Sequence, residues 1–329
     1  MTEAVCVIGA GSWGTALSMV LSRRGREVRL LARDASKAAS MQQSRCNDDY
    51  LPDIPFPESL RITASPELAL DGAAAVVVAT PCSAAGEVLP LAAGAGSGPV
   101  IAAFKGLDAA SFERVDQMLM RQVGEARAAI LSGPSFALEV ARGLPTAITM
   151  AACNEELARR AGAFFDDTAF RIYHSDDMTG VALGGALKNV IAIAAGIAAG
   201  LKLGHNAEAA VVTRGLAELM RLAGAAGARR ETLMGLSGLG DLVLTCTGEL
   251  SRNRRLGMSM AEGLSPAEAE AHIGQVAEGA RTAGAAQALA QSLDVETPLM
   301  GAVNEVLLGR LDAVEAVSRL LSRPERSEF

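Results

Sequence analysis

The sequence is poor in the residues that build metal sites and disulfide frameworks. It holds only three histidines, none of them near a cysteine, so no local zinc-ligand spacing is visible and a zinc-dependent enzyme is disfavoured. Its five cysteines are scattered, and no two form a C-x-x-C pair. An odd number of widely spaced cysteines indicates a reduced, cytoplasmic chain. We therefore expect no bound metal.

The sequence also lacks a surplus of positive charge and a long apolar run. Its formal net charge of -7 argues against general binding to nucleic acid or anionic membranes, because both require excess Lys and Arg. The longest strongly apolar run, Val190–Leu201, has 12 residues, whereas a membrane-spanning helix needs roughly 20. The N-terminal MTEAVCVIGAG has no basic region and does not resemble a secretory signal. We expect neither membrane insertion nor a nucleic-acid partner.

The order of apolar and polar segments predicts two domains of different class. At 329 residues the chain exceeds one ordinary core, since cores stop growing near roughly 250–300 residues. Short apolar, β-branched runs alternate with helical patterns, which is typical of a doubly wound parallel sheet. These runs lie at 4–10, 27–33, 74–80, 99–105, 128–133, 146–151 and 170–175. We predict an α/β Rossmann-type domain over 1–177, followed by an all-α domain over 178–329.

A glycine-rich turn, GAGSWG, follows the first predicted strand and opens a helical segment. Gly9, Gly11 and Gly14 fit the G-x-G-x-x-G pattern at the start of a βαβ unit. Gly9 permits the tight turn, Gly11 lets the backbone approach a pyrophosphate, and Gly14 lets the helix pack closely. The amides and dipole of the helix start favour phosphate groups. A plain structural turn is the alternative, but the context favours a dinucleotide site.

The end of the second predicted strand selects between NAD and NADP in many such domains. Here it reads Ala32, Arg33, Asp34. Arg33 suits the 2′-phosphate of NADP, whereas Asp34 suits the ribose of NAD or simply faces solvent. We predict a preference for NADPH or the use of both cofactors.

Three further polar residues lie among small and apolar neighbours. Lys105 follows a predicted strand, at the edge where ligands bind in open α/β sheets. Ser135 precedes a helical run, where it is either an N-cap or an anion ligand. Lys188 lies in a helical stretch of Gly, Ala, Val, Ile and Leu. It is therefore a candidate acid/base, the alternative being a snorkelling side chain whose amine reaches water.

At these segments the sequence resembles the bacterial NAD(P)-dependent glycerol-3-phosphate dehydrogenase family. The blocks GAGSWGTAL, LSGPSFA, VALGGALKN, TRGLAE, GLSGLGDLVLTCT and SRNRRLG follow in the family's order, from residue 5 to beyond 280. The resemblance implies reversible hydride transfer between NAD(P)H and dihydroxyacetone phosphate, which gives sn-glycerol 3-phosphate for glycerophospholipid biosynthesis. It implies a cytoplasmic enzyme with a small-molecule substrate and leaves a homodimer open.

The resemblance also implies roles for individual residues. Lys188 is the general acid/base, and Asp241 orients it and balances its charge. The two belong to a substrate set with Lys105, Gly133, Ser135, Ser251, Arg252 and Asn253. Besides the three glycines of the turn, the implied cofactor set is Ser12, Trp13, Arg33, Lys105, Ala137, Arg252, Val276 and Glu278. The last two otherwise fit an ordinary loop and helix start.

Two positions depart from the family pattern, and two other functions stay open. Ala182 stands where a glutamate is usual and His205 where an aspartate is usual, although neither is a predicted ligand. A related Rossmann dehydrogenase with a catalytic lysine would act on a 3-hydroxy acid or ketopantoate, so it predicts a carboxylate substrate. A non-catalytic NAD(P)-binding sensor would keep the glycine turn without needing Lys188, Asp241 and Arg252.

Overall fold

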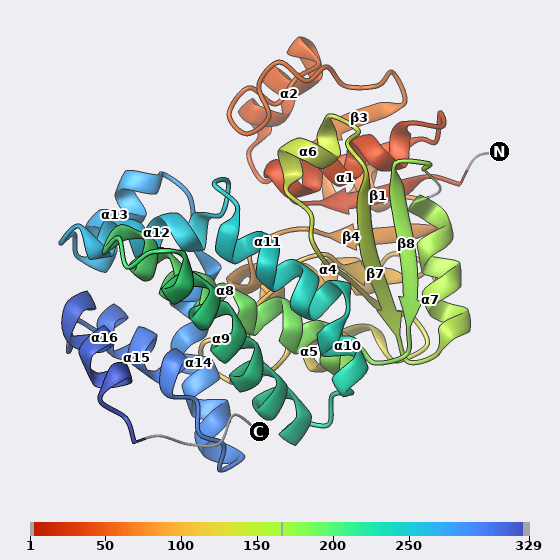
Figure 1. Ribbon diagram of the computed structural model, residues 1–329. Helices are drawn as coiled ribbons and strands as arrows, with labels where there is room; N and C mark the ends of the chain where they lie inside the picture. The colour runs from red at the N-terminus through yellow and green to blue at the C-terminus, as the bar shows by residue number, and fades with distance from the viewer. Residues whose placement is uncertain (1–2, 166, 325–329) are drawn as a thin grey trace. The chain divides into compact units, whose positions relative to one another are not determined.

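The structure is a computed structural model that describes residues 3–165 and 167–324, and the chain divides into two compact units (Figure 1). Unit 1 comprises Met1–Lys105 and Glu113–Ala182, and unit 2 comprises Gly106–Phe112 and Leu183–Phe329. The short segment 106–112 joins unit 2 because Leu107 packs into that unit's core. The predicted boundary between 177 and 178 lies just before the end of unit 1.

Unit 1 is built on an eight-stranded sheet with the order β3-β2-β1-β4-β5-β6-β7-β8 (Figure 1). Every neighbouring pair is parallel except β6 and β7, which are antiparallel with Ser132 opposite Thr149. The predicted doubly wound sheet is confirmed, with this one antiparallel pair. The strands are β1 (Val5–Ile8), β2 (Val28–Leu31), β3 (Leu60–Thr63), β4 (Ala75–Val78), β5 (Val100–Ala102), β6 (Ala128–Ser132), β7 (Thr146–Ala152) and β8 (Phe170–Ser175).

Helices cover both faces of this sheet, which explains the continuous apolar strands. In β1, Val5 and Val7 belong to one buried cluster, whereas Cys6 and Ile8 belong to another. A strand with both faces buried cannot alternate apolar with polar residues. The helices are α1 (Ser12–Ser22), α2 (Ala35–Ser44), α3 (Pro66–Leu70), α4 (Ala85–Ala93), α5 (Val115–Val123), α6 (Ala137–Ala141) and α7 (Glu155–Gly162), with 3-10 turns η1 (Cys82–Ala84) and η2 (Ala163–Phe165).

Within its described residues, the named elements of unit 2 are all helical, so the predicted all-α part is confirmed. Its first long helix begins in the last residues of unit 1. The elements are α8 (Met178–Gly200), α9 (His205–Ala225), α10 (Arg230–Met234), the π-helical turn η3 (Leu236–Gly240), α11 (Asp241–Thr247), α12 (Arg252–Ala261), α13 (Pro266–Ile273), α14 (Glu278–Ser292), α15 (Pro298–Leu307) and α16 (Ala313–Leu321).

Helix α8 is the core of unit 2. It has 23 residues and is long and apolar enough to cross a membrane, yet its most apolar stretch is completely buried inside the structure. Its backbone lies directly against that of α12. A Cβ at Gly257 would lie 2.1 Å from the carbonyl oxygen of Ile193, and one at Gly196 would lie 1.9 Å from that of Arg254. The 12-residue apolar run of the sequence therefore lies mainly in this buried helix, and glycines let α12 approach it.

Candidate active site

The three glycines of the turn between β1 and α1 do different things. Gly9 has a φ of +111°, and a Cβ there would lie 2.9 Å from the carbonyl oxygen of Ala79. A Cβ at Gly14 would lie 1.8 Å from the carbonyl oxygen of Gly9. The fold itself therefore requires both. Gly11 has an ordinary extended backbone and would meet no atom within 4 Å, so its missing side chain leaves room for a ligand instead.

Two further residues, Trp13 within this turn and Thr80 beside it, add polar groups at the carboxyl edge of the sheet. The indole nitrogen of Trp13 donates to the carbonyl oxygen of Ala103 at 2.9 Å, just beyond β5. Thr80 follows β4, with its methyl group against Gly9. Its Oγ1 is buried and has no hydrogen-bond partner among the described residues. Because an unsatisfied buried hydroxyl is costly, Thr80 is a group that a ligand would satisfy, and the sequence-based site set missed it.

At the end of β2, Asp34 has a structural task. It is the N-cap of α2, and its Oδ1 accepts hydrogen bonds from the hydroxyl of Ser36 at 2.6 Å and the amide of Lys37 at 2.9 Å. These hydrogen bonds, with that of Ser36 the stronger, lower the pKa of Asp34. Arg33 is exposed and makes no hydrogen bond or ion pair with any described residue. The cation at this strand end is thus available to an anionic group.

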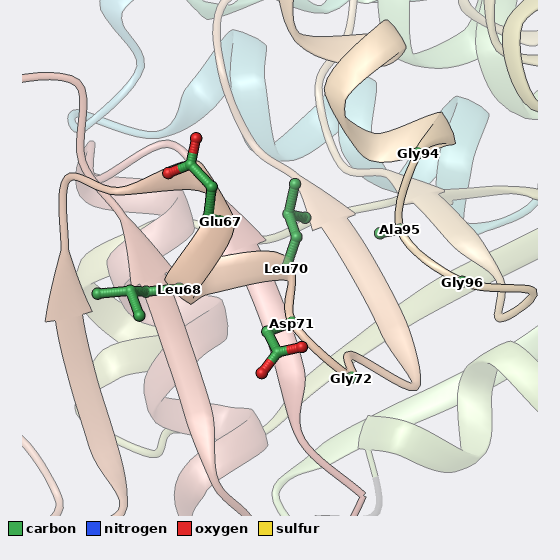
Figure 2. Close-up of a pocket in the computed structure, with 8 residues that line it drawn as sticks. All are labelled: Glu67, Leu68, Leu70, Asp71, Gly72, Gly94, Ala95 and Gly96. Atoms are coloured by element: carbon green, nitrogen blue, oxygen red, sulfur yellow. The ribbon is translucent and has the colours of Figure 1, made fainter.

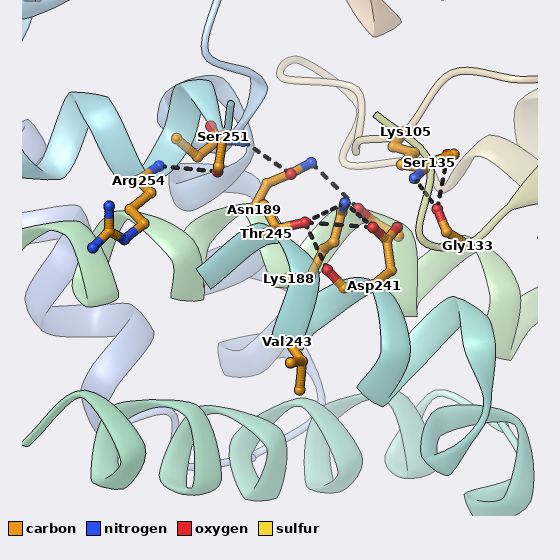
Figure 3. A network of polar contacts seen from close by, with 12 residues as sticks. Lys105, Gly133, Ser135, Lys188, Asn189, Asp241, Val243, Thr245, Ser251 and Arg254 are labelled. Atoms are coloured by element: carbon orange, nitrogen blue, oxygen red, sulfur yellow. Dashed lines mark hydrogen bonds and ion pairs between the residues drawn. The ribbon is translucent and has the colours of Figure 1, made fainter. Parts of the chain in front are cut away.

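Three predicted substrate residues meet at one carbonyl group of unit 1. The amine of Lys105 donates to the carbonyl oxygen of Gly133 at 3.1 Å, and the hydroxyl of Ser135 donates to the same oxygen at 3.0 Å (Figure 3). The N-cap of α6 is Phe136, which makes no side-chain cap, so the N-cap alternative for Ser135 is wrong. The next residue, Ala137, begins α6.

Lys188 is buried in unit 2 and forms an ion pair with Asp241. Its amine lies on α8 and reaches the carboxylate of Asp241 at the start of α11, and both side chains are more than nine-tenths buried (Figure 3). The snorkelling alternative for Lys188 is therefore wrong, because its side chain is only 8% exposed. Removing two charges from water is costly, and the attraction between the two buried ions offsets part of this cost.

Thr245 completes this cluster and fixes the direction of its hydrogen bonds. Its hydroxyl lies 2.6 Å from the main-chain carbonyl oxygen of Asp241, one turn earlier in α11, and can only donate to it. Since a hydroxyl carries one hydrogen, its oxygen must accept from the amine of Lys188 at 2.7 Å. Lys188 is thus held as a donor. Sequence reasoning missed Thr245, although it lies in the quoted GLGDLVLTCT block.

A second polar chain in unit 2 links α8, α12 and α14. The amide nitrogen of Asn253 donates to the side-chain oxygen of Asn189 at 2.9 Å, and its own oxygen accepts from the amide of Gly279 at 2.9 Å. Asn189 directly follows Lys188, and Gly279 follows Glu278 at the start of α14. Asn253 therefore connects three elements that carry predicted site residues.

The remaining predicted residues of unit 2 lie at helix starts. Ser251 is the N-cap of α12, and its Oγ accepts from the amide of Arg254 at 3.3 Å. Arg252 is exposed and is the first residue of α12. Val276 lies in the loop before α14, and Glu278 is that helix's first residue. The helix starts bring positive dipole ends to these positions.

Comparison with known proteins identifies the family. The model described as NAD-dependent glycerol-3-phosphate dehydrogenase N-terminus matches residues 4–158, and its C-terminus counterpart matches 177–318. The chain belongs to the glycerol-3-phosphate dehydrogenase family. The resemblance seen in the sequence is confirmed.

Relatives support the family over the full length. A protein of Thioalkalivibrio sulfidiphilus named glycerol-3-phosphate dehydrogenase (NAD(P)+) is 52% identical over 99% of this chain and 98% of its own. A crystal structure of glycerol-3-phosphate dehydrogenase from Coxiella burnetii has a TM-score of 0.93 at 40% identity, over 98% of this chain and 99% of that one. A ketopantoate reductase from Ralstonia eutropha reaches 0.60 at 15% identity, covering 96% of this chain and 100% of its own, which shows a shared fold alone. The ketopantoate alternative is not favoured.

Cys6 and Cys246 of this glycerol-3-phosphate dehydrogenase family member are buried thiols. None of the five cysteines forms a disulfide bond. Burial raises the pKa of Cys246 to about 12, although Lys188 and Arg254 act against this shift, and burial likewise raises the pKa of Cys6 to about 12. Both therefore stay protonated thiols near neutral pH. Among the described residues, no group of three or more His, Cys, Asp and Glu side chains could hold a metal ion.

A surface hollow of about 500 Å³ lies at the opposite edge of the sheet from the glycine turn (Figure 2). It is formed by α3 and the turn before β4 on one side and by the loop after α4 on the other. Its charged lining groups, Glu67 and Asp71, are both acidic. An anionic dinucleotide would be repelled there. The lining residues are Glu67, Leu68, Leu70, Asp71, Gly72, Gly94, Ala95 and Gly96.

Proposed function

We propose that this protein is a glycerol-3-phosphate dehydrogenase that reversibly reduces dihydroxyacetone phosphate to sn-glycerol 3-phosphate with NADPH or NADH. The observation that carries the proposal is the buried pair of Lys188 and Asp241, in a chain whose family is named for this substrate. Reduction of a ketone needs a hydride and a proton. A positioned ammonium group supplies the proton and stabilises the developing alkoxide.

The residues of unit 1 fit a dinucleotide. Gly11 leaves open space, α1 offers its N-terminal amides, and Thr80 has an unsatisfied hydroxyl at the same edge. The bound nicotinamide supplies the hydride for the carbonyl carbon. The residues that we assign to the cofactor are Gly9, Gly11, Ser12, Trp13, Gly14, Arg33, Lys105 and Ala137 in unit 1, and Arg252, Val276 and Glu278 in unit 2.

In the reductive direction, Lys188 donates a proton to the carbonyl oxygen of the substrate, and in the oxidative direction it takes the proton back. Asp241 compensates the buried ammonium charge, and Thr245 fixes the amine through its oxygen. With the amine held in one place, the proton transfer needs little reorganisation.

The substrate phosphate requires donors and cations. Arg252 supplies a planar guanidinium, which forms charge-assisted hydrogen bonds with phosphate. Asn253 donates one side-chain N–H to Asn189, and we assign its second N–H to the phosphate. Ser251 of unit 2 and Lys105, Gly133 and Ser135 of unit 1 complete the substrate set.

The exposed cation Arg33 supports a preference for NADPH, or use of both cofactors. In this proposal the Rossmann domain, 1–177, binds the cofactor, and the helical domain, 178–329, carries the proton chemistry. We assign the enzyme to the cytoplasm, without membrane insertion or nucleic-acid partner, with its product used in glycerophospholipid biosynthesis; a homodimer stays open. Comparable KM values with much faster turnover on NADH would contradict the NADPH preference.

The test follows NADPH and NADH oxidation by absorbance with dihydroxyacetone phosphate. Lys188→Met leaves the buried charge of Asp241 without a partner, which lowers the stability of the folded protein. The double variant Lys188→Met/Asp241→Asn removes both charges and serves as the folded reference. We expect both variants to lose about 10²–10⁴-fold in kcat while NADPH still binds, which is the usual contribution of a general acid.

A third variant separates charge from proton transfer. Lys188→Arg keeps a cation beside Asp241, but a guanidinium does not release its proton. We expect its kcat to fall as well. Undiminished kcat in these variants would remove Lys188 from catalysis, and activity on ketopantoate with none on dihydroxyacetone phosphate would overturn the proposed substrate.

A further inference from the structure

The side chain of Asn47 is hydrogen-bonded to both ends of the glycine turn, although its neighbours in the sequence do not indicate such a role. Asn47 lies beyond the end of α2 and is 2% exposed. Its side-chain nitrogen donates to the carbonyl oxygen of Ala10 at 3.0 Å and to Oγ1 of Thr15 at 2.8 Å. The two acceptors bracket the segment from Gly11 to Gly14. We propose that Asn47 is a positioning residue for dinucleotide binding.

The argument rests on the rigidity of the peptide unit. The carbonyl of Ala10 and the N–H of Gly11 belong to one planar peptide group, and the described chain contains no cis peptide bond. In a trans peptide the oxygen and the hydrogen point in opposite directions. When Asn47 holds the oxygen of Ala10, it therefore directs the N–H of Gly11 to the other side of the turn, away from Asn47.

Asn47 can do this because its own backbone is fixed. Its carbonyl oxygen accepts hydrogen bonds from the amides of Leu51 at 2.7 Å and Tyr50 at 3.1 Å. Leu51 is buried in the core cluster that also contains residues of β1 and α1. Both N–H groups of the carboxamide are used on the turn, so the side chain has no competing rotamer with equal hydrogen bonding. The loop and the turn are thus joined through one side chain.

The inference rests on the proposed placement of the cofactor at this turn, and the experiment separates the two. NADPH binding is measured through the fluorescence of Trp13, the single tryptophan of the chain, which lies in the turn. Gly11→Ala adds a Cβ that meets no protein atom within 4 Å, so it obstructs only a ligand. Weaker NADPH binding in Gly11→Ala with an unchanged urea midpoint places the cofactor there.

We expect Asn47→Ala to raise the Kd for NADPH by about tenfold, the loss that corresponds to one lost hydrogen bond. KM for NADPH rises in parallel, while kcat at saturating NADPH stays within about twofold, because Asn47 acts on binding and not on the proton transfer. Asn47→Asp keeps the shape but cannot donate to Ala10, so it weakens NADPH binding at least as much. If Asn47→Ala does not fold, the Kd of Asn47→Asp for NADPH is the measurement that tests the proposal.

Asn154→Ala is the matched control. Asn154 is also in unit 1 and its side chain accepts from the amide of Leu157, where it caps α7 far along the chain from the turn. Its loss costs stability alone, so its Kd for NADPH stays that of the parent. The positioning role is overturned if Gly11→Ala weakens binding while Asn47→Ala and Asn47→Asp bind like the parent, or if Asn154→Ala weakens binding equally. An unchanged Kd in Gly11→Ala would instead remove the cofactor from the turn.

Discussion

Glu218 shows how a single buried acid can tie two helices together. It lies on α9, and its carboxylate accepts hydrogen bonds from the amides of Leu299 at 2.7 Å and Met300 at 3.0 Å in the first turn of α15. The N-cap residue Thr297 makes no side-chain cap there. Glu218 therefore supplies from another helix the acceptor that an N-cap normally provides.

This carboxyl group gives a prediction on pH. Burial raises the pKa of Glu218, and the two amide hydrogen bonds only partly oppose that shift. Between the unfolded pKa and the raised folded pKa, the folded state binds more protons than the unfolded state. Stability therefore falls as pH rises through that window. We expect the free energy of unfolding of the parent, relative to Glu218→Gln, to be largest at low pH and to decline to a plateau.

Urea unfolding of both proteins at a series of pH values measures this difference. The other acids titrate alike in the two proteins, so subtraction isolates Glu218. A difference that grew with pH would show that the amide hydrogen bonds dominate over burial.

At the residue scale, a candidate catalytic residue was predictable where its side chain contrasts with its neighbours in the sequence. Lys188 stands alone among apolar helical neighbours, and this contrast is present in the sequence. Thr245 and Asn47 are ordinary in context, and their roles depend on partners 57 and 32 or 37 positions away. Only folding brings such partners together, so no local pattern reveals them.

At the scale of elements, the close contact between α8 and α12 constrains the proposed site. These helices carry Lys188 and Arg252, and their backbones touch because Gly257 lacks a side chain. We expect Gly257→Ala to force the helices apart and to destabilise the protein by about 1–3 kcal/mol or more, the usual cost of overpacking. The kcat should fall with it, because we assign groups on both helices to one substrate.

Gly224→Ala is the control for this prediction. Gly224 lies in α9 of the same unit, and a Cβ there would meet no atom within 4 Å. Since Ala is the better helix former, this change should stabilise by roughly 0.5–1 kcal/mol. Urea unfolding followed by circular dichroism gives both values. Equal stability of Gly257→Ala and the parent would contradict the tight contact.

Seven of the eight strands and the helical class of unit 2 were predictable from apolar patterns, and the exceptions have physical causes. Strand β3 was missed because it is a four-residue edge strand in which only Leu60 and Ile62 are buried. The antiparallel direction of β7 was missed because pairing direction depends on the connection and not on the residues of the strand itself. The sequence left Ser135 open as an N-cap or an anion ligand, because only the structure shows that its hydroxyl donates to Gly133 instead of capping α6.

At the scale of the whole molecule, the two units have separate hydrophobic cores. We therefore expect bound NADPH to stabilise unit 1 against unfolding more than unit 2. A ligand that binds only the folded state at about 100 times its Kd stabilises that state by about 2.7 kcal/mol. We expect NADPH at this concentration to raise, by this amount, the unfolding free energy that Trp13 fluorescence reports for unit 1. Gly11→Ala at the same concentration should show a smaller increase. Equal increases in unfolding free energy for the parent and Gly11→Ala would show that the stabilisation does not depend on binding at the glycine turn.

The buried helix α8 has a consequence for synthesis of the chain. Helices α12 and α14, which cover it through Gly257 and Gly279, follow it in the sequence and leave the ribosome later. Until then, a segment with the length and hydropathy of a membrane span is uncovered. Lys188 lies near its middle, where a charge costs about 2.5–3.5 kcal/mol on insertion into a bilayer. The residue assigned to proton transfer thus also makes insertion of the nascent helix into a bilayer less favourable.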